Sequence, residues 1–439
     1  MEETLKRTGL CLAALLAASC VLPVAAKADT QANSPLNVVW WDFFGGGDGV
    51  RMQEIIKDFN STHPDIQIKP TTLEWGTPFY TKVQTSAAVG LGPDIMTYHL
   101  SRLPLGVSTG SLRPFTDAEV ASMGLSAKDF PAADWKAAHV NGRLYAIPLD
   151  IHSIILYYNK NLLAKAGLLG PDGLPKDLNG IQNFDAALKK LTGANGAEYG
   201  LSFASLSGDG AASWRLFYTL LEQQGGTFMQ GDEVLPGNST EKAIVATKTI
   251  ADWVKEGWVP RQTDDDASLA LFTSGKAAMM IKGDWEVPTV LGLAKKNQLG
   301  FQWGAVQIPV LFDHPATWAD SHSFAIPNRK GNPVPPDEIK ADLTIISWIE
   351  HHAVMWAGGG HIPAYLPASQ SEAFKNMQPN STYSSLTKTA VFDPRSVLAG
   401  VASPIYSACE NFIQPAINGQ LSAKAAIAQF KEQIEGDMQ

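Results

Sequence analysis

Aromatic rings and hydrogen-bonding side chains follow each of the first three strands that the sequence predicts. They are Trp41 and Asp42 after the first strand, Trp75 after the second, and Tyr98 and His99 at the end of the third. A pyranose has apolar C–H faces and a rim of hydroxyl groups, which flat rings and carboxylate or imidazole groups complement. Ligands of open α/β sheets bind outside the carboxyl ends of strands. These residues are therefore candidates for binding a polyhydroxylated ligand.

Two motifs that carry catalysis or cofactor binding in other folds have the wrong context here. Residues 106–110 match G-x-S-x-G, but Pro104 before them indicates a short helix rather than the strand that a nucleophile elbow requires. Residues 45–49 lack the G-x-G-x-x-G spacing of dinucleotide sites. His351 and His352 lie in one predicted helix without a third ligand. We therefore expect no catalytic residues, no cofactor and no metal.

The elements that must position the candidate residues alternate between strands and helices, which predicts an α/β fold. Their order near the N-terminus implies a parallel sheet with right-handed crossovers. A second region of the same kind begins near Ile151. The predicted strands are residues 36–41, 66–68, 93–98, 151–158 and 277–281, and the predicted helices include residues 52–60, 82–89, 241–256 and 423–434.

Length and composition restrict the possible classes of protein. The chain has 439 residues, of which 45% are hydrophobic and 18% are charged, which is typical of a globular protein. A single hydrophobic core stops growing at about 250–300 residues, so we expect about two domains. The 43 acidic and 34 basic residues give a net charge of −9. No basic surface that would neutralise nucleic-acid phosphates is indicated, and we expect no nucleic-acid partner.

The first residues have the pattern of a secretory signal peptide over residues 1–28. Lys6 and Arg7 precede an apolar run over residues 10–24, and a small-x-small triplet ends at Ala28. Cys20 offers an alternative, because the residues before it loosely resemble a lipoprotein cleavage box. We expect cleavage after Ala28 and a periplasmic protein. Cys409 is then the only cysteine left, which excludes an internal disulfide.

Six segments, in this order, resemble the family 1 extracellular solute-binding proteins of bacterial ABC importers, which include maltose-binding proteins. The most specific segment is residues 141–168, which read NGRLYAIPLDIHSIILYYNKNLLAKAGL. The others are the strand ending in Trp40 and Trp41, residues 55–68 (IIKDFNSTHPDIQI), residues 90–95 (GLGPDI), residues 271–285 (LFTSGKAAMMIKGDW) and residues 304–309.

The resemblance implies a two-lobed clamshell of type II, in which each lobe is a mainly parallel sheet flanked by helices and a sugar binds in the cleft. The N-lobe would comprise residues 36–148 and 322–358, and the C-lobe residues 153–318 and 362–439. Crossovers between the lobes are expected near residues 147–152, 320–326 and 358–363. The crossovers and C-lobe segments add these candidate ligand-binding residues: Asp150, His152, Asp209, Trp214, Asp284, Trp285, Trp318, His322 and His361.

Packing in the core is the competing interpretation for several tryptophans. Trp40 and Trp41 point to opposite faces of their strand, and we expect Trp40 to face the core. Trp214 could instead pack its helix together with Phe217 and Leu221. Trp285 follows a predicted strand in a Gly-x-Trp pattern that the family shares, and it is the best single candidate for a sugar platform.

The resemblance implies the substrate-binding subunit of an ABC importer. Such a subunit is not an enzyme; it acts as a monomer and delivers a mono- or oligosaccharide to membrane permease subunits. A secreted carbohydrate-active hydrolase is one alternative, because tryptophans and paired carboxylates also build glycosidases. The same fold could instead bind a glycerophosphodiester, which would require cations in the cleft. Arg102, Arg113 and Arg395 are eligible for that role.

Overall fold

The computed structural model describes residues 34–332 and 334–439, and residues 35–439 form one compact unit. The predicted signal peptide over residues 1–28, including Cys20, lies outside the described residues. Among the described residues, none of the helices has the length and apolar character needed to cross a membrane. Cys409 is a free, buried cysteine.

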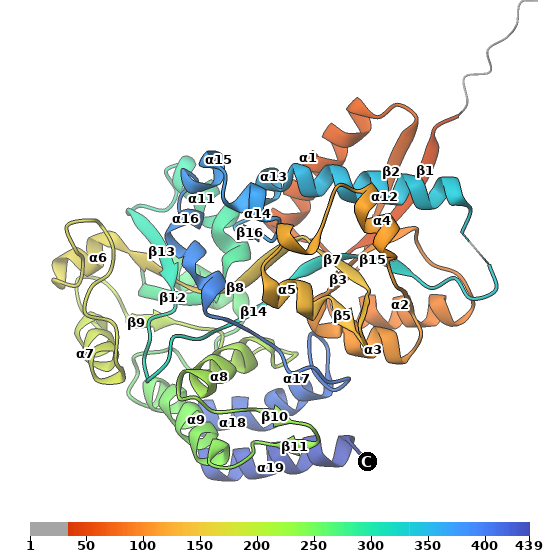
Figure 1. The fold of residues 1–439 in the computed structure, drawn as a ribbon. Helices are drawn as coiled ribbons and strands as arrows, with labels where there is room; N and C mark the ends of the chain where they lie inside the picture. Colours follow the sequence, from red (N-terminus) through yellow and green to blue (C-terminus); the bar gives the residue numbers. More distant parts are fainter. Residues whose placement is uncertain (1–33, 333) are drawn as a thin grey trace, which may run out of the picture. The chain divides into compact units, whose positions relative to one another are not determined.

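A six-stranded sheet contains the N-terminal strands (Figure 1). Its central strand β3 lies between β1, which runs parallel to it, and β15, which runs antiparallel. β2 extends the sheet parallel to β1, and β4 and β7 pair antiparallel with β15. The strands are β1 (Leu36–Asp42), β2 (Ile66–Thr72), β3 (Ile95–His99), β4 (Leu112–Arg113), β7 (Ala146–Pro148) and β15 (His322–Pro327).

A seven-stranded sheet is built around β8 (Asp150–Asn159), all ten residues of which are buried. β8 pairs antiparallel with β12, β13, β14 and β16. Parallel pairs join β9 to β12 and β14 to β17. The partners are β9 (Tyr199–Ser202), β12 (Ala277–Gly283), β13 (Trp303–Gln307), β14 (Thr317–Asp320), β16 (Ile362–Pro363) and β17 (Ala390–Phe392).

The prediction that each sheet is mainly parallel is wrong, although the α/β class is confirmed. The parallel order of β1, β2 and β3 is as predicted. Both sheets are nevertheless mixed, because β15 returns against β3 and because β8 is surrounded by antiparallel strands from later in the chain. The β-α-β order of the first hundred residues predicts parallel pairing among β1, β2 and β3. It does not predict how strands far apart in the sequence pair.

Helices cover both sheets. On the six-stranded sheet, α1 buries Met52, Ile55, Ile56 and Phe59 at helical spacing. The helices between β1 and β7, together with the two that follow β15, are α1 (Gly46–Thr62), α2 (Thr77–Ala88), α3 (Leu103–Ser108), α4 (Asp117–Ser122), α5 (Ala132–Ala137), α12 (Pro336–His351) and α13 (Ala353–Ala357). Trp40 is fully buried among them, as the alternation along β1 predicts.

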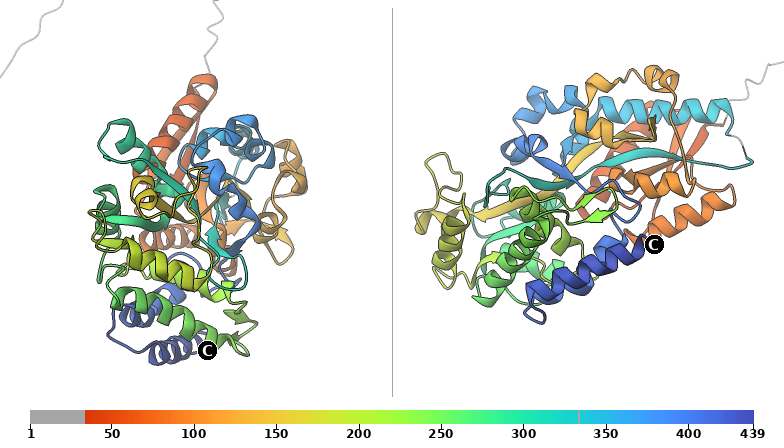
Figure 2. Two further views of the ribbon diagram at one scale, coloured as in Figure 1. Left: turned by 90° about the vertical axis from the view of Figure 1, so that its left-hand side faces the viewer. Right: turned by 60° about the horizontal axis from the view of Figure 1, so that its bottom comes forward.

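Helices from distant parts of the sequence pack together beside the seven-stranded sheet. Figure 2 shows the C-terminal α19 running alongside α9, and contacts join α9 to α8, α18 and α19. Apart from α12 and α13, the helices that follow β8 in the chain are α6 (Lys160–Lys165), α7 (Ile181–Leu191), α8 (Ala211–Gln223), α9 (Ser239–Lys255), α10 (Asp265–Thr273), α11 (Val287–Lys295), α14 (Leu366–Ser369), α15 (Glu372–Lys375), α16 (Asn380–Tyr383), α17 (Pro404–Ala408), α18 (Gln414–Ile417) and α19 (Ala423–Asp437).

Two of the segments that carry the chain from one sheet to the other are adjacent. Leu149 joins β7 to β8, and Ser321 joins β14 to β15. The two segments are hydrogen bonded, because the Leu149 amide donates to the His322 carbonyl at 2.8 Å. The first residues of β8 and β15 therefore meet where the sheets adjoin.

The G-x-S-x-G segment lies in a helix, as predicted. Residues 103–108 form α3, which follows a 3₁₀ turn η1 (Leu100–Arg102) and ends before Gly110 at a φ of +66°. The Ser108 hydroxyl donates to the Leu105 carbonyl at 2.9 Å. This is not a strand-to-helix nucleophile elbow.

Candidate functional site

A cavity of about 510 Å³ lies where the two sheets adjoin. Its walls come from the turns after β1 and β2, the start of α8, the end of β12 with its following 3₁₀ turn η3 (Asp284–Glu286), and the first residues of β8 and β15. Six of the predicted ligand-binding residues line it: Trp75, His99, His152, Asp209, Trp285 and His322. Eight do not: Trp41, Asp42, Tyr98, Asp150, Trp214, Asp284, Trp318 and His361.

Two tryptophans present indole surface to the cavity. Trp75 is 37% exposed and follows β2, whereas Trp285 is half-buried in η3 and follows β12. The Arg215 guanidinium lies 4.9 Å from the ring centre of Trp285 and 4.6 Å from that of Trp318. A cation–π contact with Arg215, which also lines the cavity, thus holds the ring of Trp285.

Three predicted residues serve the packing of the core instead. Trp214 and Trp318 are fully buried and donate from Nε1 to Asp393 Oδ1 at 2.7 and 3.0 Å. Tyr98 is fully buried and packs edge-on against Tyr80, with ring centres 5.2 Å apart. These side chains turn away from the cavity because their strands and α8 also have to fill the interior of the protein.

The other two N-terminal candidates lie beside the cavity without lining it. Trp41 packs on the core that contains Trp40, and the Lys82 ammonium lies 5.7 Å from its ring centre. Asp42 is buried, and its Oδ1 accepts a hydrogen bond from the Phe44 amide at 3.0 Å. That bond shapes the turn which carries Phe43 and Phe44 into the cavity wall.

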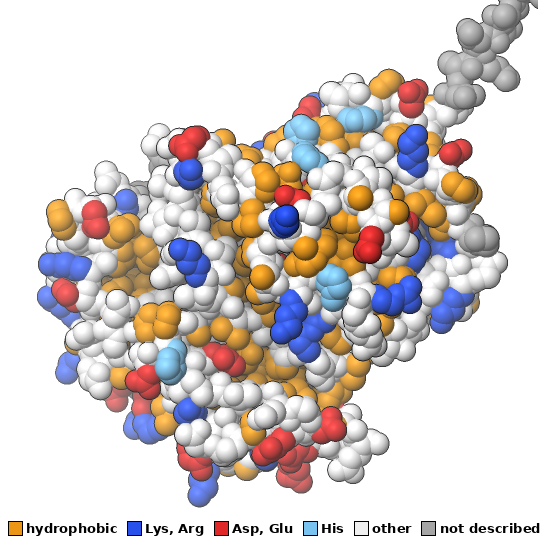
Figure 3. All heavy atoms as spheres, viewed as in Figure 1, with side chains coloured by type: hydrophobic (Ala, Val, Ile, Leu, Met, Phe, Trp, Pro, Cys, Tyr) orange, Lys and Arg blue, Asp and Glu red, His pale blue; other side chains and the backbone are white. Residues whose placement is uncertain are grey.

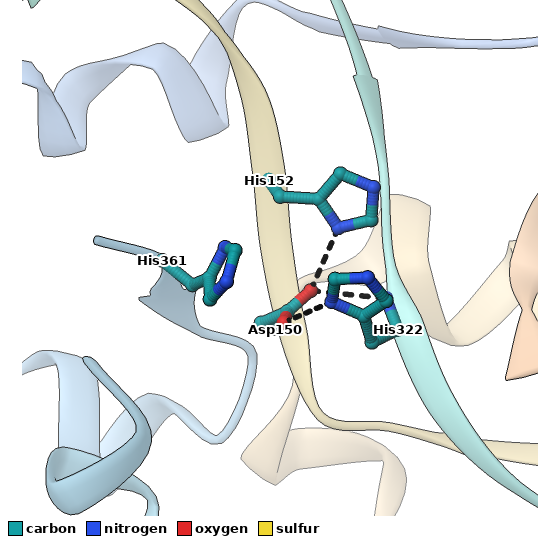
Figure 4. A group of neighbouring side chains, drawn as sticks. All are labelled: Asp150, His152, His322 and His361. Atoms are coloured by element: carbon teal, nitrogen blue, oxygen red, sulfur yellow. Dashed lines mark hydrogen bonds and ion pairs between the residues drawn. The ribbon is translucent and has the colours of Figure 1, made fainter. Parts of the chain in front are cut away.

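Asp150 binds two of the cavity histidines from behind. Figure 4 shows His152 and His322 both directed at its carboxylate, with Nδ1–oxygen distances of 3.1 and 2.7 Å. Asp150 also accepts from the His322 amide at 2.9 Å and from Trp356 Nε1 at 2.6 Å. Burial alone would raise the pKa of Asp150, but His322, His361 and His152 hold it well below the usual value. Asp150 is therefore an ionised carboxylate that accepts four hydrogen bonds.

His361 lies between Asp48 of α1 and Asp284 of η3, the turn that follows β12. Its Nε2 lies 3.0 Å from Asp48 Oδ1, and its Nδ1 lies 3.3 Å from Asp284 Oδ1. Burial alone would lower the pKa of His361, but the carboxylates of Asp48, Asp150 and Asp284 raise it well above the usual value. Burial raises the pKa of Asp284 to about 6. His361 thus carries a proton between two carboxylates, and it positions Asp48, which does line the cavity.

Two groups of side chains have the composition of a metal site. In one, Asp150, His152, His322 and His361 bring one potential ligand atom each within 4.8 Å of the others. His99, His152 and Asp320 form the other group. Hydrogen bonds within the protein already use most of these atoms: Asp150 binds the two histidines, and Asp320 accepts from Ser101 and Ser321. We therefore interpret both groups as hydrogen-bonded networks.

Several residues that line the cavity were not among the candidates predicted from the sequence. Arg215 follows Trp214 on α8, so that one lies on the cavity side of the helix when the other faces the core. Phe43, Phe44, Glu74, Lys282 and Glu286 lie within two residues of predicted ones, and Asp48 lies in the first turn of α1. Asp265 and Asp266 also line it; they lie in the first turn of α10, whose N-cap is Asp264.

The cavity carries more negative than positive charge. Its lining includes the carboxylates of Asp48, Glu74, Asp209, Asp265, Asp266 and Glu286, against the cations Arg215 and Lys282. Lys282 Nζ is already bound to Asp265 at 2.7 Å and lies 3.7 Å from Glu286.

The three arginines that were eligible to bind a phosphate ester lie elsewhere. Arg102 donates to the Ala399 carbonyl, Arg113 pairs with Glu119 at 2.9 Å, and Arg395 donates to the Ala137 carbonyl. On the face of the molecule shown in Figure 3, basic and acidic side chains are interspersed, without one continuous basic patch.

Comparisons with known proteins agree with this architecture. An uncharacterised ABC transporter extracellular-binding protein of Pyrococcus horikoshii is 24% identical over 81% of this chain and 78% of its own length. A mannitol-binding protein of Pseudomonas aeruginosa is 27% identical over 72% of this chain and 69% of its own length.

The fold is shared with solved structures of binding proteins. The GacH receptor of Streptomyces glaucescens, solved without ligand and with acarbose, superposes with a TM-score of 0.75 at 19% identity, over 91% of this chain and 97% of its own. This similarity confirms the predicted clamshell fold.

The sequence also matches the family described as bacterial extracellular solute-binding proteins over residues 46–341. That match covers more than half of the chain. Members of this family bind solutes rather than convert them, so the chain is not an enzyme. The protein belongs to the bacterial extracellular solute-binding protein family.

Proposed function

We propose that the protein captures a neutral saccharide or polyol in the 510 Å³ cavity and delivers it to the permease of a bacterial ABC importer. The observation that carries the proposal is the pairing of exposed indole surface, from Trp75 and Trp285, with carboxylates and imidazoles in one cavity. Indole faces bind the apolar side of a sugar ring, and the polar groups bind its hydroxyls.

The location of the cavity supports a mechanism of closure. Trp75 belongs to the segment after β2 of the six-stranded sheet, and Trp285 to the segment after β12 of the seven-stranded sheet. We propose that each sheet is the centre of one lobe, with the lobe boundaries given above. A ligand that contacts both lobes favours the closed state, since only that state makes both sets of contacts. The closed state is then recognised by the permease in the periplasm.

The charge of the cavity favours a neutral ligand over a glycerophosphodiester. A phosphate group requires cations, and of the two in the cavity Lys282 is already paired with Asp265. Relatives with names that specify a ligand include the mannitol-binding protein described above. That name supports a polyol or sugar as the ligand class of this chain. Other relatives are named sn-glycerol-3-phosphate-binding proteins, so the charge of the cavity, not the names, carries the choice of a neutral ligand.

A thermal-shift screen tests the proposal. Mannitol, maltotriose, galactobiose and sn-glycerol 3-phosphate are added separately to the mature protein. A ligand that binds only the native state stabilises it by about 2.7 kcal/mol at a hundredfold excess over its Kd. This stabilisation raises the melting temperature. We expect at least one neutral compound to do so. Stabilisation by glycerol phosphate alone, with an affinity that falls steeply with salt, would contradict the neutral-ligand proposal.

A further inference from the structure

Three histidines line one part of the cavity, which we call its floor. The ring nitrogen Nε2 of each histidine is open to the cavity. His99, His152 and His322 are 2%, 3% and 6% exposed, and all three line the cavity. Their ring centres lie 4.1 to 5.6 Å apart. Each ring uses Nδ1 for a hydrogen bond within the protein. Among the described residues, no hydrogen-bond partner is found for Nε2 of any of the three.

The partner of Nδ1 determines where the proton of each neutral ring lies. An ionised carboxylate only accepts hydrogen bonds. His152 must therefore carry its proton on Nδ1, 3.1 Å from Asp150, and its Nε2 is a bare acceptor. Burial and the neighbouring His322 lower the pKa of His152 to about 3, which keeps this ring neutral. His322, bound to the same carboxylate at 2.7 Å, has the same tautomer when neutral.

His99 has the opposite tautomer. Its Nδ1 lies 2.6 Å from the Tyr80 hydroxyl, which is buried and has no other acceptor among the described residues. Tyr80 must therefore donate to Nδ1, and the proton of His99 lies on Nε2. Burial, together with His322 and His152, lowers the pKa of His99 well below its usual value, so that this ring is neutral as well. The cavity floor thus presents one N–H donor beside one or two nitrogen acceptors.

We propose that this donor–acceptor floor recognises a hydroxyl group of the ligand, and that Tyr80 and Asp150 are the positioning residues that set its pattern. A hydroxyl both accepts and donates, so it can accept from His99 Nε2–H and donate to His152 Nε2. A carboxylate or a fully ionised phosphate cannot donate to His152, and an ammonium group cannot accept from His99. An ether oxygen leaves His152 Nε2 unpaired, and a deoxy carbon leaves both nitrogens unpaired. The inference rests on the proposed function and specifies which ligand group reaches the floor.

The stacking of the rings favours this interpretation over a metal ion held by the three Nε2 atoms. His152 and His322 are stacked, with planes only 29° apart and ring centres 4.1 Å apart. Both rings also bind the carboxylate of Asp150 through Nδ1. The lone pairs on their Nε2 atoms are therefore nearly parallel. Ligands of a tetrahedral ion must instead converge on one point.

Tyr80→Phe is the most selective test. Tyr80 does not line the cavity, and phenylalanine keeps its shape, so the substitution removes only the proton donated to His99. His99 can then move its proton to Nδ1, which changes Nε2 from a donor to an acceptor. We expect the affinity for whichever of mannitol, maltotriose or galactobiose binds the unchanged protein to fall about tenfold in calorimetry.

Tyr218→Phe is the matched control. Tyr218 is also buried, and its hydroxyl donates to the Phe392 carbonyl at 3.2 Å, away from the cavity lining. We expect this variant to bind with unchanged affinity. An equal loss of affinity in both variants would overturn the proposed role of Tyr80.

¹⁵N NMR determines the tautomers of the three histidines without any ligand. Measured on the unchanged protein, it tests the proposal even if Tyr80→Phe fails to fold. Long-range ¹H–¹⁵N spectra of the unchanged protein are expected to show a bare Nε2 on His152 and a protonated Nε2 on His99. In Tyr80→Phe the His99 Nε2 signal is expected to lose its protonated shift. A protonated Nε2 on His152, or unchanged affinity in Tyr80→Phe, would overturn the inference while leaving saccharide binding intact. Failure of all three neutral probes to bind the unchanged protein would instead contradict the proposed function.

Discussion

Gly283 leaves the space that the Trp285 indole occupies, and adding one methyl group there should displace the ring. A Cβ atom at Gly283 would lie 2.1 Å from Cε2 and Cζ2 of Trp285. Ordinary contact begins at 3.4 Å, so the ring must move by about 1.3 Å, the difference between the two distances. The φ of Gly283 is −68°, which alanine adopts without strain. Gly283→Ala therefore acts on the ring rather than on the backbone.

The expected loss of affinity follows from the stacking area of one indole. Burying an aromatic side chain contributes about 1.5–3 kcal/mol, so losing its stacking weakens binding roughly ten- to hundredfold. We expect Trp285→Ala and Gly283→Ala each to fall in this range. Because both changes remove the same contact, the double variant should bind no more weakly than Trp285→Ala alone.

Calorimetry with the most strongly stabilising saccharide of the panel, together with ligand-free melting curves, measures both quantities. Gly292→Ala in α11 is the matched control, since nothing lies within 4 Å of an added Cβ atom. We expect it to keep full affinity and to gain about 0.5–1 kcal/mol of stability from the better helix former. Unchanged affinity in Gly283→Ala, or fully additive losses in the double variant, would refute the assignment of Trp285 as a platform.

The remaining predictions concern the core, pH and closure. Trp253→Ala removes a buried ring whose Nε1 donates to Asp185 at 2.8 Å, and melting curves should show a loss of about 3–5 kcal/mol with unchanged saccharide affinity. Burial, with the nearby Asp94 carboxylate, raises the pKa of Asp342 to about 8 from a usual 3.8, so stability should fall as pH rises between these values. Asp342→Asn should therefore raise the melting temperature at pH 8 but hardly at pH 4; an equal shift at both would contradict this reasoning. Small-angle scattering should show a smaller radius of gyration when the saccharide saturates the protein, and an unchanged radius would argue against closure.

Local patterns predicted the elements better than their long-range partners. The alternation along β1 correctly placed Trp40 in the core, and the segment of residues 151–158, rich in isoleucine and tyrosine, correctly predicted the buried strand β8. The directions of the strands that pair with β8 depend on segments more than a hundred residues away, which no local period records. For that reason the mixed character of both sheets was not predicted.

The same limit applies to the candidate site. Residue types near strand ends identified six residues that line the cavity, but the choice between Trp214 and Arg215 depends on the rotation of α8 against its neighbours. The sequence also could not separate side chains that line the cavity from those that hold them. Asp150 and His361 lie one layer behind the wall because their own hydrogen-bond partners fill the space around them.

The pairing of β8 has a consequence for the order of folding. Its partners lie at residues 277–283, 303–307, 317–320 and 362–363, and β3 must wait for β15 at residues 322–327. Closing such long loops costs chain entropy before any pairing compensates for it, which slows folding. A nascent chain that ends before residue 317 carries β3 without its β15 neighbour and β8 without β14 or β16. Unpaired strand edges recruit other chains, so truncated forms of this protein are expected to aggregate rather than to fold as a half-molecule.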